Sequence, residues 1–152
     1  MPPSSSKEEK KFYALRWASF YALALSLMII SYHVNPAILY LFVVDDRYTL
    51  GHHGSYWQDW HAIGCAFAGL VNYGAAYDSD FGPSARRWVG HCNAFLFGIW
   101  GLQNTYNCLF QGYNFTPLMW LQAIGCLGTA LWNYVSMESK SVSSSAEGKK
   151  GY

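Results

Sequence analysis

The stretch Ala-Ile-Gly-Cys at residues 62–65 decides the fold that we predict, because the chain contains it twice. The second copy lies at residues 123–126, and in both copies an asparagine follows the cysteine by seven residues, at Asn72 and Asn133. Seven residues are about two turns of an α-helix, so each cysteine and its asparagine share one helix face. The repeat therefore predicts two equivalent helices, each with a polar stripe.

The composition indicates an all-α integral membrane protein of one domain. Of the 152 residues, 52% are hydrophobic and only 12% are charged, whereas about a quarter of the residues of a soluble domain are charged. The charged residues lie mainly at the two ends and in two loops. The net charge of +1, without a basic patch, gives no indication of nucleic-acid binding.

Four apolar stretches are long enough to cross a hydrocarbon core of ~30 Å. They lie at about residues 12–34, 57–77, 88–111 and 118–137, between tails at residues 1–11 and 138–152 that we predict to be disordered. Asn35-Pro36 ends the first stretch, because proline lacks an N–H donor and restricts the preceding residue. The short apolar segment 37–44 is either an interfacial helix or an extension of the first span.

The basic residues predict the orientation of the spans. Nine of the ten Lys and Arg residues fall on the side that carries both termini, and only Arg47 falls on the other side. Loops rich in Lys and Arg remain in the cytosol. Both termini are therefore predicted on the cytosolic or equivalent side of a membrane whose identity the sequence leaves open.

The repeat extends to whole hairpins if a second match is included. The first span opens with Arg16-Trp17 and the third with Arg87-Trp88. Two hairpins with an even number of spans each would have the same orientation, related by an axis along the membrane normal. The Arg-Trp pairs are 71 residues apart and the Ala-Ile-Gly-Cys copies 61, so the first hairpin would carry about ten extra residues in its loop. The predicted fold is a four-helix bundle of two tandem hairpins.

Polar residues recur at helical spacing in all four spans and predict an inward polar seam. Three groups share a depth along the spans: His33, His61, Asn104 and Gln122 at the non-cytosolic end, Ser19, Asn72, Asn93 and Asn133 at the cytosolic end, and Ser26, Cys65, Cys126 and Thr129 between them. The seam either holds the helices together by hydrogen bonds or lines a cavity for a cofactor, such as haem, quinone or pigment, a lipid or a small solute.

Histidines and carboxylates near the non-cytosolic end form a candidate metal site. Its members are His52, His53, Asp59 and His61, whose side-chain types bind Zn, Fe or Cu. Their spacing matches no metal motif, and a polar loop with interfacial histidines is the simpler interpretation. A variant uses His33 and His61 as the two axial ligands of a haem.

Three classes of function remain open. The chain has no catalytic motif for nucleophilic, phosphate or zinc-protease chemistry. We therefore predict a non-catalytic accessory or assembly subunit that binds other membrane proteins, or its own copies, in the lipid bilayer. The first alternative is a binding or transport module whose seam holds a ligand, and the second is a membrane enzyme that uses the His/Asp metal site.

Overall fold

The computed structural model describes residues 6–31, 33–41, 52–110 and 116–138. In these residues the chain forms four α-helices, one short 3-10 helix and no strand, which confirms the predicted all-α class. The elements are α1 (Ser6–Ser31), η1 (Pro36–Leu41), α2 (His52–Tyr77), α3 (Pro83–Phe110) and α4 (Pro117–Glu138). The predicted C-terminal tail from residue 139 onward lies outside the described residues.

All four helices begin earlier than the predicted spans, because a helix continues beyond its apolar stretch. Residues 6–11, which we assigned to a disordered tail, form the first turns of α1. Pro83 and Pro117 are the first residues of α3 and α4, a position that suits proline because its φ is already helical and its missing N–H has no partner there. Residues 36–41 form η1 as a separate element, so they do not extend α1.

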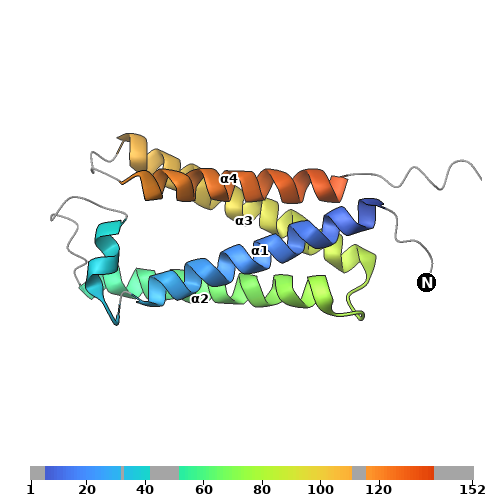
Figure 1. The fold of residues 1–152 in the computed structure, drawn as a ribbon, viewed down its shortest axis with the longest axis horizontal. Coiled ribbons are helices and arrows are strands. Elements are labelled where there is room, and N and C mark those ends of the chain that lie inside the picture. The colour runs from blue at the N-terminus through green and yellow to red at the C-terminus, as the bar shows by residue number, and fades with distance from the viewer. Residues whose placement is uncertain (1–5, 32, 42–51, 111–115, 139–152) are drawn as a thin grey trace, which may run out of the picture.

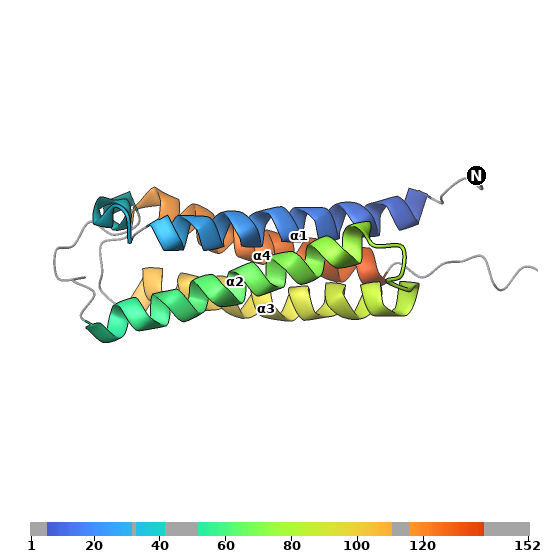
Figure 2. The same ribbon diagram turned by 90° about the horizontal axis from the view of Figure 1, so that it is seen from below.

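The four helices form two antiparallel hairpins (Figures 1 and 2). α1 packs mainly on α2 and α3 mainly on α4, and the hairpins meet chiefly along α1 and α4. α1 and α3 run in one direction, and α2 and α4 in the other. The start of α1, the α2–α3 turn and the end of α4 therefore lie at one end of the bundle, which we call the basic end. The opposite end is the η1 end.

Contacts between the helices correct the register of the repeat. In the first hairpin the Ser19 hydroxyl donates a hydrogen bond to the Gly69 carbonyl over 2.9 Å. The residue equivalent to Gly69 in the second copy is Ala130, and a Cβ built on Gly98 would lie 3.9 Å from the Cβ of Ala130. Ser19 thus corresponds to Gly98, whereas the Arg-Trp match pairs it with Gly90. That match is wrong by eight residues, about two helical turns.

The interior of the bundle is built from small and polar residues, whereas the large apolar side chains point outward. Buried positions include Ala14, Ala18, Ala22, Ala62, Ala75, Ala123, Ser19, Ser26, Asn72, Asn93, Thr129 and Asn133. Phe97 and Leu15 are the largest fully buried apolar side chains in the described part of the chain. Phe67 on α2 is 70% exposed, and Trp88 and Phe95 on α3 are 71% and 72% exposed. This distribution is the reverse of that in a soluble helical bundle.

One described stretch, Lys10–Ser31 of α1, is long and apolar enough to be a candidate membrane span on its own. The stretch is 39% buried within the bundle. The other three helices contain glycine, asparagine, tyrosine and tryptophan in their middle turns, and these residues lower their mean hydropathy.

Candidate functional site

Three asparagines from three helices meet near the basic end of the bundle. Asn72 of α2 and Asn93 of α3 exchange carboxamide hydrogen bonds of 2.9 and 2.6 Å. The second N–H of Asn93 is directed at Asn133 Oδ1 of α4 over 3.1 Å. The three side chains are 1%, 3% and 0% exposed. The predicted convergence of Asn72, Asn93 and Asn133 is therefore present, and these residues form an asparagine cluster that joins α2, α3 and α4.

The two repeat asparagines are held in the same way. Asn72 Nδ2 also donates to the Ala68 carbonyl over 2.8 Å, and Asn133 Nδ2 donates to the Thr129 carbonyl over 3.0 Å. Each acceptor lies four residues before its asparagine. A carboxamide has two N–H donors, so Asn72 and Asn93 use both of theirs within the protein. The asparagine cluster is thus suited to linking helices, because few of its donors remain for a ligand.

Two hydrogen bonds from α1 extend this polar layer. Trp17 Nε1 donates to Thr129 Oγ1 of α4 over 2.9 Å, and Ser19 bonds to α2 as described above. In the sequence Trp17 is noted only as part of the Arg16-Trp17 pair, and no motif indicates its contact with α4. An indole N–H needs an acceptor where it is withdrawn from water, and Thr129 is 1% exposed. α1 is therefore joined at this level to α2 of its own hairpin and to α4 of the other.

The Trp17–Thr129 hydrogen bond is expected to stabilise the bundle by about 0.5–1.5 kcal/mol, the net contribution of a typical hydrogen bond within a protein. A double-mutant cycle with Trp17→Phe and Thr129→Val measures it as the non-additive part of the two changes. The readout is the free energy of unfolding in detergent. Strictly additive effects would show that this hydrogen bond contributes nothing.

An aromatic layer lies at the middle of the bundle. The Tyr21 hydroxyl of α1 donates to the Gln122 carbonyl of α4 over 3.2 Å and lies 3.6 Å from Cys126 Sγ. The Tyr21 ring lies 5.8 Å from Phe97, and Phe97 meets Trp100 edge-on at 5.5 Å. Aromatic contacts of this kind add to the stabilisation from burial. Tyr21 is thus a structural contributor that the polar pattern did not identify.

The aromatic layer follows the corrected repeat. Trp100 of α3 stacks on His61 of α2 with ring centroids 4.9 Å apart. His61 and Gln122 occupy the same position in the two copies, and the register that pairs Ser19 with Gly98 also pairs Tyr21 with Trp100. The first helix of each hairpin therefore sends an aromatic side chain to the repeated helix of the other. Cys65 and Cys126, also at equivalent positions, are buried free thiols.

The predicted polar group at the η1 end has separate partners instead of one shared cluster. His33 Nε2 lies 2.5 Å from Asp59 Oδ1, and both side chains are about half exposed. His61 stacks on Trp100, while Asn104 and Gln122 are half-buried. Ser19, Ser26 and His33 share a seven-residue spacing, but α1 ends at Ser31. His33 therefore lies in the turn after the helix, and the spacing does not carry it to the polar face.

The candidate metal site is only partly described. His52 and His53 belong to the first turn of α2, but their side chains lie outside the described part of the chain. Among the described side chains, no group of three or more His, Cys, Asp or Glu residues could hold a metal ion. The imidazole of His33 contacts Asp59, and that of His61 contacts Trp100, so the two histidines have different neighbours. Metal and haem binding remain sequence-based hypotheses.

Comparison of the chain with protein-family models, curated proteins and solved structures found no match.

Proposed function

We propose that the chain is a four-span integral membrane protein that acts as a non-catalytic accessory or assembly subunit of a larger membrane complex. The observation that carries the membrane assignment is the reversed distribution of side chains: carboxamides and hydroxyls inside, and large apolar side chains outside. Contiguous exposed apolar surface indicates contact with lipid or another protein. In a bilayer, polar groups must find partners within the protein, as those of the asparagine cluster do.

The lengths of the helices suit this proposal. α4 has 22 residues, which corresponds to ~33 Å at ~1.5 Å per residue and compares with a hydrocarbon core of ~30 Å. α2 and α3 are longer, with 26 and 28 residues. Their polar residues lower the hydropathy of each helix alone, but in the bundle Asn72, Asn93 and Asn133 are turned away from the outer surface. The assembled bundle therefore presents a more apolar surface than its sequence suggests.

Charges at the basic end favour an orientation with this end on the cytosolic or equivalent side. The described basic residues there are Lys10, Lys11, Arg16, Arg86 and Arg87. Arg86 donates to the carbonyls of Ala75 and Asp78 over 2.9 and 2.8 Å. It thereby provides hydrogen-bond donors to backbone carbonyls at the end of α2, which lack a partner within the helix. Arg16 lies over the ring of Tyr77 at 4.8 Å. Both termini would then be on that side.

The subunit role is supported by the use of the polar interior and by the nature of the outer surface. The asparagine cluster uses its hydrogen bonds to link helices, which is a structural task. The outer surface is rich in aromatic side chains, among them Phe67, Trp88, Phe95, Tyr106 and Phe110. Aromatic residues are enriched where proteins bind one another. The surface therefore offers several places for contact with other membrane proteins.

One purification tests both parts of the proposal. The full chain is expressed in cells, its membranes are washed at alkaline pH, and the pellet is solubilised in a mild detergent for native mass analysis. We expect the chain to remain in the pellet and then to co-purify with larger membrane proteins at a fixed stoichiometry. Release by the alkaline wash would contradict the membrane assignment. Retention followed by isolation as a monomer or homo-oligomer would contradict the accessory role alone.

A further inference from the structure

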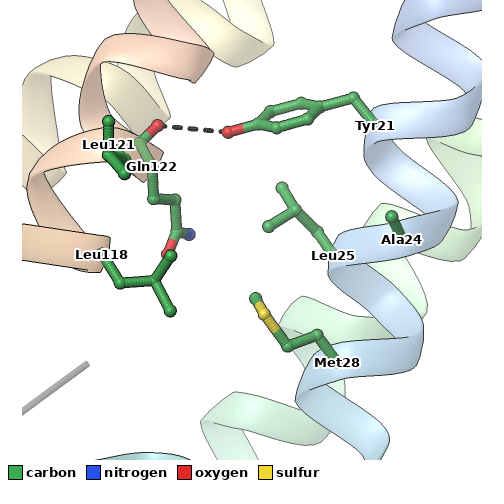
Figure 3. A pocket seen from close by; sticks show the side chains of 7 residues that line it. All are labelled: Tyr21, Ala24, Leu25, Met28, Leu118, Leu121 and Gln122. Atoms are coloured by element: carbon green, nitrogen blue, oxygen red, sulfur yellow. Dashed lines mark hydrogen bonds between the residues drawn. The ribbon is translucent and has the colours of Figure 1, made fainter. Parts of the chain in front are cut away.

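A groove between α1 and α4 opens on the outer surface of the bundle towards the η1 end (Figure 3). Its volume is about 260 Å³, and it is lined by Tyr21, Ala24, Leu25, Met28, Leu118, Leu121 and Gln122. The bond from the Tyr21 hydroxyl to the Gln122 carbonyl crosses from α1 to α4 at one end of the groove. The remaining wall is almost entirely hydrocarbon, which suits an apolar ligand with one polar group.

The side chain of Gln122 provides the polar group of this groove. Its backbone carbonyl accepts the bond from Tyr21, but its carboxamide makes no hydrogen bond with the described residues. An amide without a partner is costly away from water. In Figure 3 the carboxamide points along α4 towards Leu118, and so towards the start of that helix. Helical side chains lean in this direction.

The depth of this carboxamide identifies the class of ligand. Gln122 lies five residues after Pro117, the first residue of α4, which is ~7.5 Å of helix. In the proposed orientation the start of α4 lies at the edge of the hydrocarbon core, and the carboxamide reaches back towards that edge. The ester carbonyls of glycerolipids lie at this boundary, directly above their acyl chains. An ester carbonyl is an acceptor, which matches the N–H donors of Gln122.

We propose that the α1–α4 groove binds one acyl chain of a glycerophospholipid, with Gln122 Nε2 donating a hydrogen bond to the ester carbonyl of that chain. The chain runs along Leu25 and the exposed Ala24 towards Tyr21. This inference rests on the proposed membrane location. The acyl chain covers the apolar wall of the groove, and the ester carbonyl above it gives the N–H donors of Gln122 an acceptor.

Native mass spectrometry of the full chain in mild detergent tests the site with dioleoylphosphatidylcholine as the probe. Ala24→Phe fills the groove, and Gln122→Leu removes the carboxamide at similar size. Ala85→Phe and Gln103→Leu are the matched controls, since both residues are exposed on α3 and line no described groove. A dialkyl ether analogue of the lipid, which lacks ester carbonyls, tests the hydrogen bond from the ligand side.

We expect the wild type and both controls to retain one phosphatidylcholine. Ala24→Phe should lose it, and Gln122→Leu should bind it about three- to tenfold more weakly, as expected for the loss of one hydrogen bond between groups in a membrane. The ether analogue should bind to the wild type as weakly as the ester lipid binds to Gln122→Leu. The ether analogue should bind to Gln122→Leu at least as well as to the wild type, because the substitution also removes the amide that the ether lipid would leave unpaired.

Equal lipid retention by Ala24→Phe and the wild type would overturn the groove assignment, even if the chain stays in alkaline-washed membranes. Equal losses in Ala24→Phe and Ala85→Phe would overturn it too, because they would indicate general loss of surrounding lipid. If Ala24→Phe keeps the lipid and instead releases a co-purifying protein, a partner occupies the groove and the lipid proposal is wrong. Release of the wild type at alkaline pH would reject the membrane location itself.

Discussion

Replacing Asn93 with leucine is expected to destabilise the bundle by about 3–4 kcal/mol, the largest effect of any single change proposed for this chain. Asn93 takes part in all three hydrogen bonds that join the asparagine cluster across helices. Its loss removes those bonds and leaves the carboxamide oxygens of Asn72 and Asn133 buried without their donors. An unpaired buried polar group costs about 1–3 kcal/mol, more than the net gain of making the bond.

The free energy of unfolding in detergent, measured by denaturant titration, provides the test. Asn104→Leu is the matched control, because Asn104 lies on the same helix, is half-buried and is outside the asparagine cluster. The control should change the stability by less than about 1 kcal/mol. Equal effects of the two substitutions would show that the cluster does not hold α2, α3 and α4 together.

Replacing Gly101 with alanine is expected to destabilise the protein by about 1–3 kcal/mol, the usual cost of overpacking. A Cβ at this position would lie 2.6 Å from Leu127 Cγ and 3.0 Å from the backbone nitrogen of Leu127. The leucine side chain can rotate, but a backbone atom cannot move without displacing α4. Glycine at position 101 thus permits the close approach of α3 and α4.

Gly128→Ala on α4 is the matched control for this change. A Cβ on Gly128 would meet nothing within 4 Å, and alanine is favoured over glycine inside a helix by up to about 1 kcal/mol. Thermal unfolding in the same detergent should therefore rank the proteins as Gly128→Ala, wild type and Gly101→Ala, from most to least stable. A Gly101→Ala protein as stable as the wild type would show that α3 and α4 do not need this close approach.

Near the basic end of the bundle, the sequence was sufficient to predict much of the polar interior. Asn72, Asn93 and Asn133 lie in the interiors of long helices, where a seven-residue spacing places side chains on a common face. Near the η1 end the same reasoning failed for His33, because the spacing assumes that α1 continues. The end of a helix interrupts the pattern, and a side chain beyond it takes its direction from the turn.

The Arg-Trp match failed for a different reason. Basic and aromatic residues accumulate where helices meet an interface, so Arg16-Trp17 and Arg87-Trp88 can recur without marking equivalent packing positions. The register of a hairpin is set by contacts between its two helices. In the first hairpin Ser19 bonds to the carbonyl of Gly69, and in the second Leu127 packs where Gly101 has no side chain. Such contacts join residues far apart in the chain, so local spacing does not reveal them.

The sequence by itself determined the four helices, the doubling of one helix and the polar stripes, because helical periodicity and chain length are local properties. Only the tertiary structure decided that Trp17 bonds to Thr129, that Tyr21 reaches α4 and that the carboxamide of Gln122 lines a groove. Each of these features depends on the register and crossing of two helices. That register follows from the packing of the whole bundle, in which every helix limits the positions open to the others.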